Sequence, residues 1–363
     1  RAFCPVRTGG CGDIADTETG SAAEGSGMTV SDALIARLRP HLDTCAVNDL
    51  LARAVKAASV TGNEAAMAAM VQPEMARLGL EPLVQDFLPG RPNITGRRKG
   101  AGVGPELLFI GHTDVVHPRD WDTHWVGQPQ QDPFGAAIVD GELWGRGAAD
   151  LKAGICTSLA ALDLLDRAGI RLAGSVSFAF VGDEESGEPE TGISAGIRHW
   201  TEAVLRGEAK RPDLAVYVEP TRLQVLPVQT GFFIADVVLT GKSAYFGRPD
   251  LGRDALKAAH LILQAIWDHS DGLAARKDHP LLGRAFTLVT GLEAGGLIAV
   301  PGEARLSMIG KLLPGDNLDE VTDALQAVIR AACPVDIGCE IRGRCPAHPG
   351  RGREYIAQGC RHH

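Results

Sequence analysis

The stretch Leu107-Leu108-Phe109-Ile110-Gly111-His112-Thr113-Asp114 decides the fold. Its first four residues form an apolar run that is too short and too apolar for a surface helix, so it predicts a buried strand. The run ends in an imidazole and a carboxylate. Because open α/β proteins bind ligands beyond the carboxyl ends of their strands, His112 is a candidate site residue.

Two later runs end in the same way. Ser175 to Val181 is β-branched and aromatic and precedes Asp183-Glu184-Glu185, and Leu214 to Val218 precedes Glu219. Before these two runs, Gly145-Arg146-Gly147 leads to Asp150 at the start of a helical pattern. We therefore expect one cleft in an α/β domain to collect five side chains: His112, Asp150, Glu184, Glu185 and Glu219.

These side chains suit a metal centre. Zinc takes imidazole nitrogen and carboxylate oxygen as ligands, and two ions about 3.5–4 Å apart can activate a water and polarise a carbonyl. Asp114 lies two residues after His112 and could orient its ring. Glu184 and Glu185 are adjacent, so they must approach from different directions. One as ligand and one as general base is a natural division.

The chain is long enough for two domains, and its pattern changes after Pro227. Strands and helices then alternate in the order β-α-β-β-α-β, a split βαβ sandwich. We expect an α/β domain at 28–226, with a mixed central sheet flanked by helices, and a smaller α+β domain at 227–342. The expected elements of the smaller domain are Phe232–Leu239, Asp254–His269, Ala285–Thr290, Ala304–Leu313, Leu318–Ala332 and Val335–Ile341.

The larger domain has helical spacing in three early segments, and Ser31 is a candidate N-cap for the first of them. Pro89 to Gly104 is rich in Pro, Gly, Arg and Lys, so we expect a loop there, and we expect Lys152 on a helix surface. The other expected elements are helices at Ala33–Leu38, Val47–Ala58, Glu64–Leu78, Lys152–Ala168 and Ala195–Arg206, a strand at Leu80–Phe87 and a hairpin at Asp140-Gly141.

The two ends of the chain lack apolar periodicity. Residues 1–27 precede Met28 and are expected to be a disordered, non-native extension, with a short natural extension as the alternative. Residues 343–363 look like an out-of-frame tail. In a rival interpretation, Cys and His side chains of the C-terminal segment form a zinc knot: Cys339, Cys345, His348, Cys360 and His362.

Composition excludes several classes of function. A net charge of −9 argues against a nucleic-acid partner. No apolar run approaches the roughly 20 residues of a membrane helix, and we expect no secretory signal. Eight cysteines are too sparse for a disulfide scaffold, so we expect free thiols and a cytoplasmic protein.

Taken jointly, the motifs resemble the family of acetylornithine deacetylase, succinyl-diaminopimelate desuccinylase, aminoacylase and carboxypeptidase G, over roughly residues 30 to 340. They are His112-Thr113-Asp114-Val115-Val116, Asp132-Pro133-Phe134, 140–147 (DGELWGRG), Asp150-Leu151-Lys152, Asp183-Glu184-Glu185-Ser186-Gly187 and Glu219-Pro220-Thr221. The resemblance implies a hydrolase with two zinc ions, sometimes cobalt, that acts on N-acyl amino acids or small peptides, in arginine or lysine biosynthesis or peptide turnover. It also implies that the smaller domain is an inserted lid through which the protein forms a homodimer.

The resemblance assigns a role to each residue of the cleft. His112 and Glu219 would bind one metal, and Asp150 would bridge both ions. Glu185 would bind the other metal, Glu184 would be the general base, and Asp114 would support His112.

Three features depart from the family. Tyr245 stands where the lid usually offers a His to the substrate, and Ile298 stands in place of an Asn. A tyrosine hydroxyl can still donate a hydrogen bond to an oxyanion, so we expect Tyr245 to contact the substrate. The alternatives are that Tyr245 is purely structural or that the activity has been lost. We also expect the return segment, which in the family carries the second metal's His, to be missing, and this leaves open an inactive, truncated member that keeps the fold.

Overall fold

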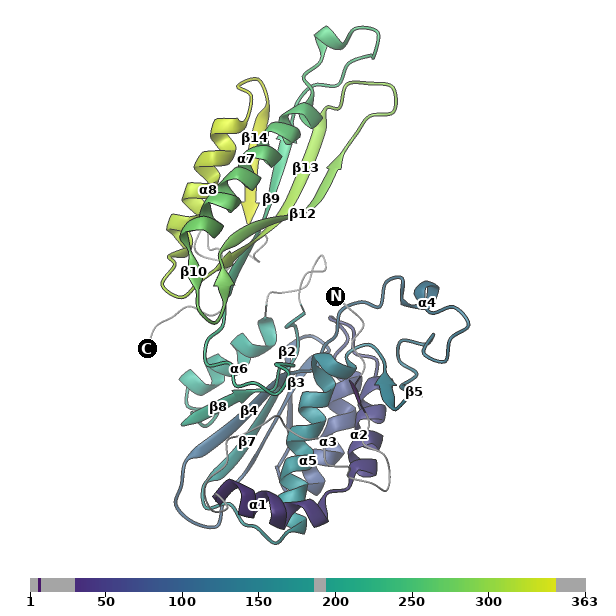
Figure 1. Cartoon of the computed structure of the whole chain (residues 1–363), viewed down its shortest axis with the longest axis vertical. Helices are drawn as coiled ribbons and strands as arrows, with labels where there is room; N and C mark the ends of the chain where they lie inside the picture. The colour runs from purple at the N-terminus through teal and green to yellow at the C-terminus, as the bar shows by residue number, and fades with distance from the viewer. Residues whose placement is uncertain (1–5, 8–29, 186–193, 344–363) are drawn as a thin grey trace, which may run out of the picture. The chain divides into compact units, whose positions relative to one another are not determined.

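The computed structural model describes residues 6–7, 30–185 and 194–343. The chain divides into two compact units, residues 1–223 and 224–363, which are described separately below (Figure 1).

The first unit is built on a mixed five-stranded sheet in the order β2-β3-β7-β4-β8. Strand β4 pairs in parallel with β7 and β8, whereas β3 pairs antiparallel with β7 and β2. Parallel strands end at the same edge of a sheet, so the ends of β4, β7 and β8 come together, as the sequence predicts. The bounds are β2 Leu83–Leu88, β3 Arg91–Arg98, β4 Glu106–His112, β7 Ser175–Val181 and β8 Leu214–Tyr217.

Helices cover both faces of this sheet (Figure 1). Helices α2, α3 and α5 share the main apolar core with one face, through buried side chains such as Met67, Ile94 and Ile155. Helix α6 contacts β2, β3 and β7 on the other face. The remaining bounds are α1 Val30–Leu38, η1 Arg39–His41, α2 Thr44–Lys56, α3 Ala65–Arg77, α4 Trp121–His124, α5 Ala153–Arg167 and α6 Ala195–Leu205, with a small sheet of β1 Val6–Arg7, β5 Ala137–Val139 and β6 Glu142–Trp144.

The loop predicted at Pro89–Gly104 is wrong, because strand β3 occupies half of it. Gly90 has a φ of 72°, which a left-handed turn requires, and the chain then enters the interior of the sheet. Arg91 and Asn93 are buried there with polar partners. The charged residues of this segment indicated a loop, because the acidic groups that pair with Arg91 in the folded chain lie far away in sequence.

Two smaller expectations also fail. Lys152 lies in the core rather than on a helix surface, and its Nζ donates to the carbonyls of Ala54 at 2.9 Å and Ala57 at 2.8 Å. Burial disfavours the charged form and lowers the pKa of Lys152 to about 7. Helix α1 begins at Val30, so Ser31 lies inside it and is not its N-cap.

The second unit confirms the predicted β-α-β-β-α-β order. Its four-stranded antiparallel sheet has the order β12-β13-β9-β14, and α7 and α8 share an apolar core with it. Strands β10 and β11 form a separate short hairpin. The bounds are β9 Gly231–Thr240, η3 Pro249–Leu251, α7 Ala255–Arg276, β10 Asp278–His279, β11 Gly283–Arg284, β12 Phe286–Ala294, β13 Glu303–Leu312, α8 Leu318–Ala332 and β14 Gly338–Gly343.

The predictions made for the chain ends lie largely outside the described residues. These include the extension at 1–27, the tail beyond Gly343 and four of the five residues of the zinc knot. Cys156, Cys333 and Cys339 carry free thiols, whereas Cys45 is disulfide-bonded, which corrects the expectation of free thiols throughout. Among the described residues, no helix has the length and apolarity needed to cross a membrane.

The core of the second unit makes a prediction for helix α7. Ile262 is fully buried in it, while its neighbour Leu261 is 49% exposed. We expect Ile262→Ala to lower the free energy of unfolding by about 2–5 kcal/mol, because it removes buried methyl groups and leaves a cavity. Leu261→Ala is the matched control and should cost less than about 1 kcal/mol. Urea unfolding followed by circular dichroism measures both, and equal losses would contradict this assignment of the core.

Candidate metal centre

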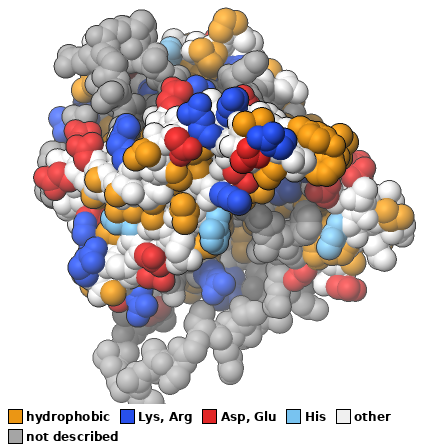
Figure 2. Space-filling view, turned by 90° about the horizontal axis from the view of Figure 1, so that it is seen from above, with side chains coloured by type: hydrophobic (Ala, Val, Ile, Leu, Met, Phe, Trp, Pro, Cys, Tyr) orange, Lys and Arg blue, Asp and Glu red, His pale blue; other side chains and the backbone are white. Residues whose placement is uncertain are grey.

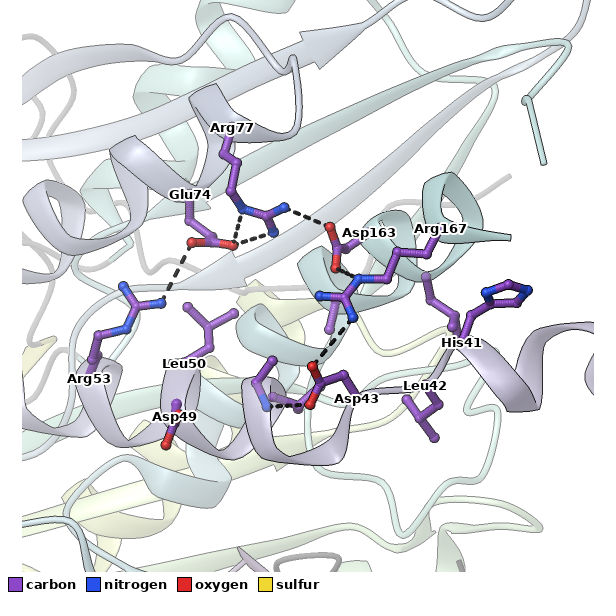
Figure 3. A pocket seen from close by; sticks show the side chains of 14 residues that line it. His41, Leu42, Asp43, Asp49, Leu50, Arg53, Glu74, Arg77, Asp163 and Arg167 are labelled. Carbon is purple, nitrogen blue, oxygen red and sulfur yellow. Dashed lines mark hydrogen bonds and ion pairs between the residues drawn. The ribbon is translucent and has the colours of Figure 1, made fainter. Parts of the chain in front are cut away.

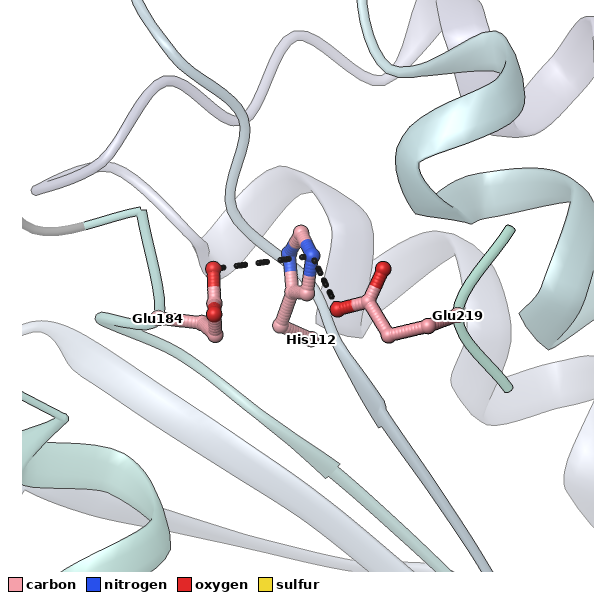
Figure 4. A group of neighbouring side chains, drawn as sticks. All are labelled: His112, Glu184 and Glu219. Carbon is pink, nitrogen blue, oxygen red and sulfur yellow. Dashed lines mark ion pairs between the residues drawn. The ribbon is translucent and has the colours of Figure 1, made fainter. Parts of the chain in front are cut away.

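Four segments bring the predicted side chains to the carboxyl edge of the sheet. His112 is the last residue of β4 and is fully buried. Glu184 follows β7, and Glu219 follows β8. Figure 4 shows the carboxylates of Glu184 and Glu219 on either side of the His112 ring. Asp150 lies in the short segment Ala148–Lys152 that leads into α5, and its own φ of −115° and ψ of 96° are not helical.

The two nitrogens of His112 have different partners. Nδ1 lies 2.8 Å from the backbone carbonyl of Asp114. Nε2 faces three carboxylates, with Asp150 Oδ1 at 3.1 Å, Glu219 Oε1 at 3.6 Å and Glu184 Oε2 at 3.8 Å. A carbonyl only accepts, so the neutral ring carries its proton on Nδ1 and leaves the Nε2 lone pair for a cation.

Asp114 contacts the His112 ring through its backbone rather than through its side chain. Its carboxylate lies 3.7 Å from His112 Nδ1, and its backbone carbonyl is what fixes the ring. The carboxylate instead accepts hydrogen bonds from the backbone N–H of Glu184 at 3.1 Å and of Glu185 at 2.9 Å, and from the Thr61 hydroxyl at 3.0 Å. One residue thus joins the His112 ring to the acidic pair.

The ligand atoms form two triads that share His112. One contains His112, Asp150 and Glu185, and the other contains His112, Glu184 and Glu219, with all ligand atoms of each triad within 4.8 Å of one another. The structure thus brings together all five residues that the strand ends indicated. The grouping differs from the roles implied by the resemblance, because Glu184, the expected base, sits in a triad with Glu219.

The electrostatics of the site favour a bound cation. Burial lowers the pKa of His112, but the hydrogen bond to Asp150 and the fields of Asp114, Glu184 and Glu219 more than offset this and raise it to about 10. Burial, with Glu185, Glu219 and Asp114 nearby, raises the pKa of Glu184 to about 7, although His112 opposes the shift. A divalent ion would compensate the negative charge of these carboxylates, which bound protons must otherwise do. Imidazole with carboxylates is a donor set that zinc accepts. The residues fit a metal.

Sequence reasoning missed one residue at this edge, Tyr217. It is the last residue of β8, and its hydroxyl hydrogen-bonds Glu219. Burial, together with the negative charge of Glu184 and Glu219, raises its pKa. An aromatic residue in a strand normally indicates packing, so the sequence carried no signal for this contact.

Tyr245, the remaining predicted site residue, belongs to the second unit and is 62% exposed. Tyr245 pairs with Ala299 in an isolated antiparallel bridge, which places Ile298 in the adjoining segment. The two departures from the family are therefore neighbours in the fold. A catalytic role for Tyr245 stays a prediction.

A pocket between α2, α3 and α5 is a separate feature (Figure 3). Its charged side chains pair with one another, as in Arg77 with Asp163 at 2.7 Å and Arg167 with Asp43 at 3.4 Å. Asp163 and Arg167 lie near the end of α5, roughly 20 Å along the helix from Asp150 at its start. Ion pairs that join helices explain this pocket, so we assign it no chemistry.

Comparison with known proteins agrees with this geometry. Residues 108–347 match the family described as Peptidase family M20/M25/M40. A succinyl-diaminopimelate desuccinylase of Methylorubrum extorquens strain PA1 is 29% identical over 315 residues, which cover 84% of this chain and 77% of that protein.

Two solved structures share the fold. The dipeptidase Dug1p of Saccharomyces cerevisiae superimposes with a TM-score of 0.64 at 14% identity, covering 86% of this chain and 79% of that one. The metallo-carboxypeptidase Sso-CP2 of Sulfolobus solfataricus, described as an M20 family member, gives 0.61 at 19% identity, covering 80% and 76%.

The pKa shifts predict how metal binding depends on pH. Both pKa values are raised in the folded chain, from 6.5 to about 10 for His112 and from 4.5 to about 7 for Glu184. Groups of this kind stabilise the fold fully below their unfolded pKa and lose that contribution as pH rises through the folded one. The free energy of unfolding of the metal-free chain should therefore fall as pH rises from about 4.5 to 10. Zinc must displace the His112 proton to bind, so the stabilisation that zinc gives should increase over the same rise in pH.

The measurement is the zinc-induced rise in melting temperature at several pH values from about 6 to 8.5. We expect this rise to grow with pH in the wild type and to be small and nearly constant in His112→Asn. A rise in the wild type that shrinks with increasing pH would contradict the assignment of His112 as a ligand.

Proposed function

Because the chain belongs to the peptidase family M20/M25/M40, we propose that it is a zinc-dependent amidohydrolase that cleaves the amide bond of an N-acyl amino acid or small peptide. The observation that carries the proposal is the pair of triads that share the buried His112. Two ions would use four of these five side chains as ligands and leave Glu184 as the base.

In this proposal His112 and Glu219 would hold one metal, Glu185 would hold the other, and Asp150 would be a ligand of both. The Asp150 carboxylate is 40% exposed, and its Oδ1 lies 3.1 Å from His112 Nε2. Zinc is preferred because of the mixed imidazole and carboxylate set, and cobalt accepts the same ligands. When bound, the metal polarises the substrate carbonyl and lowers the pKa of a water.

Glu184 is the proposed general base. Its carboxylate is 33% exposed, so water and substrate can reach it. A pKa raised toward neutrality suits a group that takes a proton from water and then returns it to the leaving amine. Asp114 holds the Glu184 backbone N–H, which fixes the direction of approach.

The substrate class follows from family membership and from the desuccinylase name of the M. extorquens relative, which supports an acylated amino acid of amino-acid biosynthesis. Tyr245 and Ile298 are 62% and 68% exposed, so both altered side chains are available to a ligand. We propose that they give this chain substrate contacts different from those of relatives with His and Asn, and that the Tyr245 hydroxyl donates to the oxyanion.

We also propose a cytoplasmic homodimer formed through the second unit. Strand β12 is an edge of its sheet and exposes Phe286, Leu288 and Leu292, and an exposed apolar edge strand favours pairing with another chain. Figure 2 shows acidic, basic and hydrophobic side chains interspersed on the face in view. Such a surface fits a protein partner better than nucleic acid, which needs clustered positive charge.

Glu184→Gln tests the mechanism. We expect it to bind zinc as the wild type does and to lower kcat by at least 10²-fold, because the amide cannot take a proton. Glu185→Gln is the matched control and should lose metal instead, with a lower zinc content per chain. Zinc is counted by mass spectrometry, and hydrolysis is followed on N-succinyl-diaminopimelate, N-acetylornithine and a set of dipeptides.

Either of two outcomes would contradict the proposal. Hydrolysis that survives in Glu184→Gln would show that another group is the base. A wild-type chain that binds two zinc ions and hydrolyses no linear amide would favour the alternative, a fold kept without activity.

Tyr245→Phe tests the substrate contact. If the hydroxyl donates to the oxyanion, its loss should lower kcat by about 10²–10³-fold with little change in KM. Phe246→Leu is the control, since Phe246 is an equally exposed neighbour without a hydroxyl. An unchanged kcat in Tyr245→Phe would leave Tyr245 a structural residue.

A further inference from the structure

Arg91 lies at the start of β3, a strand that contributes no residue to the two triads. Its guanidinium bridges two carboxylates that are completely buried. It contacts Glu64 through Nη2 at 2.5 Å and through Nε at 3.0 Å, and Asp183 through Nη2 at 2.8 Å. The Arg91 side chain is itself 10% exposed.

Asp183 is the residue immediately before the acidic pair, and its backbone is held in an uncommon conformation. Its φ of 67° lies in the left-handed region, which residues other than glycine rarely adopt. Its second carboxylate oxygen accepts from Ala195 N–H at 2.9 Å, and its carbonyl accepts from Ser194 N–H at 3.0 Å. Arg91 thus fixes the side chain of Asp183, which precedes the acidic pair and is hydrogen-bonded to the backbone at the start of α6.

Asn93 repeats this arrangement two residues along the same strand face. Its Nδ2 donates to the Gly196 carbonyl at 2.8 Å, and its Oδ1 accepts from Gly182 N–H at 3.1 Å. The packing is tight, since a Cβ on Gly196 would lie 2.7 Å from Asn93 Oδ1. Arg91 and Asn93 together hold the chain just before Glu184-Glu185 and again at the start of α6.

We propose that Arg91, acting through Asp183, is a positioning residue for the metal centre. Two contacts then hold the acidic pair Glu184-Glu185. The Asp114 carboxylate accepts hydrogen bonds from the backbone N–H groups of the pair, and Arg91 binds the side chain of the preceding residue, Asp183. A buried charge is costly unless it is paired, so a triad of one cation and two buried carboxylates persists only in the arrangement that pairs them. This inference rests on the proposed function, because it assigns Arg91 a role toward the same ligands.

A rival explanation is that Arg91 stabilises the fold alone, and the chain supplies a matched control. Arg97, at the other end of β3, pairs with the buried Glu106 through Nε at 3.0 Å and Nη2 at 2.7 Å. The rise along a strand puts it roughly 20 Å from Arg91. Arg97→Lys breaks a similar forked ion pair on the same strand, away from the acidic pair.

The experiment titrates metal-free chains with Co²⁺ alone and records its visible absorption, which reports ligand geometry without turnover. Lysine has one ammonium in place of the fork, so Arg91→Lys cannot span both carboxylates. We expect it to weaken Co²⁺ binding by roughly 10–100-fold and to change the absorption band, as loss of a ligand's supporting contacts does. The Co²⁺ affinity of Arg97→Lys should stay within about twofold of the wild-type value, even if its melting temperature falls as much as that of Arg91→Lys.

A second pair of variants decides the matter if Arg91→Lys yields no folded protein. Asp183→Asn removes the charge that Arg91 holds, and Glu106→Gln removes the charge that Arg97 holds, each at nearly constant shape. We expect only Asp183→Asn to alter Co²⁺ affinity and absorption. Wild-type affinity and spectrum in Arg91→Lys and Asp183→Asn would overturn the inference, as would equal changes in all four variants.

Failure of the proposed function would look different. The wild-type chain would then take up no Co²⁺, and that result overturns both proposals before any variant is compared. Wild-type metal binding with unaltered Arg91→Lys and Asp183→Asn would overturn the positioning role alone.

Discussion

The structure depends on one buried imidazole that faces more negative charge than it can neutralise. Nε2 of His112 is within 4 Å of carboxylates from three different segments, and its other nitrogen is fixed by a backbone carbonyl. Carboxylates that converge in this way on a buried ring are unfavourable unless a proton or a cation compensates their charge. The parallel strands β4, β7 and β8 make the convergence unavoidable, because their ends meet at one edge of the sheet.

The sequence was sufficient for the parts of the fold that have local signals. Apolar runs and glycine stops indicated β4, β7, β8 and most helices, and the β-α-β-β-α-β order of the second unit was readable from its periodicity. The site followed from the same signals, since polar residues after buried strands must lie together. His112, Asp150, Glu184, Glu185 and Glu219 all meet there.

What the sequence did not show are polar residues whose partners lie far along the chain. Arg91 made β3 look like a loop, and Lys152 looked like a surface residue, because each owes its burial to groups in another element. Asp114 was expected to orient the His112 ring, and the contact that does so is its backbone carbonyl rather than its carboxylate. Tyr217 gave no signal at all. For Arg91 and Lys152, distance in sequence rather than residue type limited the prediction.

The most direct test of the account is a crystal structure of the zinc-loaded chain with anomalous data collected at the zinc absorption edge. The account predicts two anomalous peaks about 3.5–4 Å apart, one of them roughly 2.0–2.1 Å from Nε2 of His112, with a carboxylate oxygen of Asp150 near both. Zinc absent from this edge of the sheet, or bound only at surface residues while Nε2 still faces bare carboxylates, would contradict the claim that these side chains converge to hold metal.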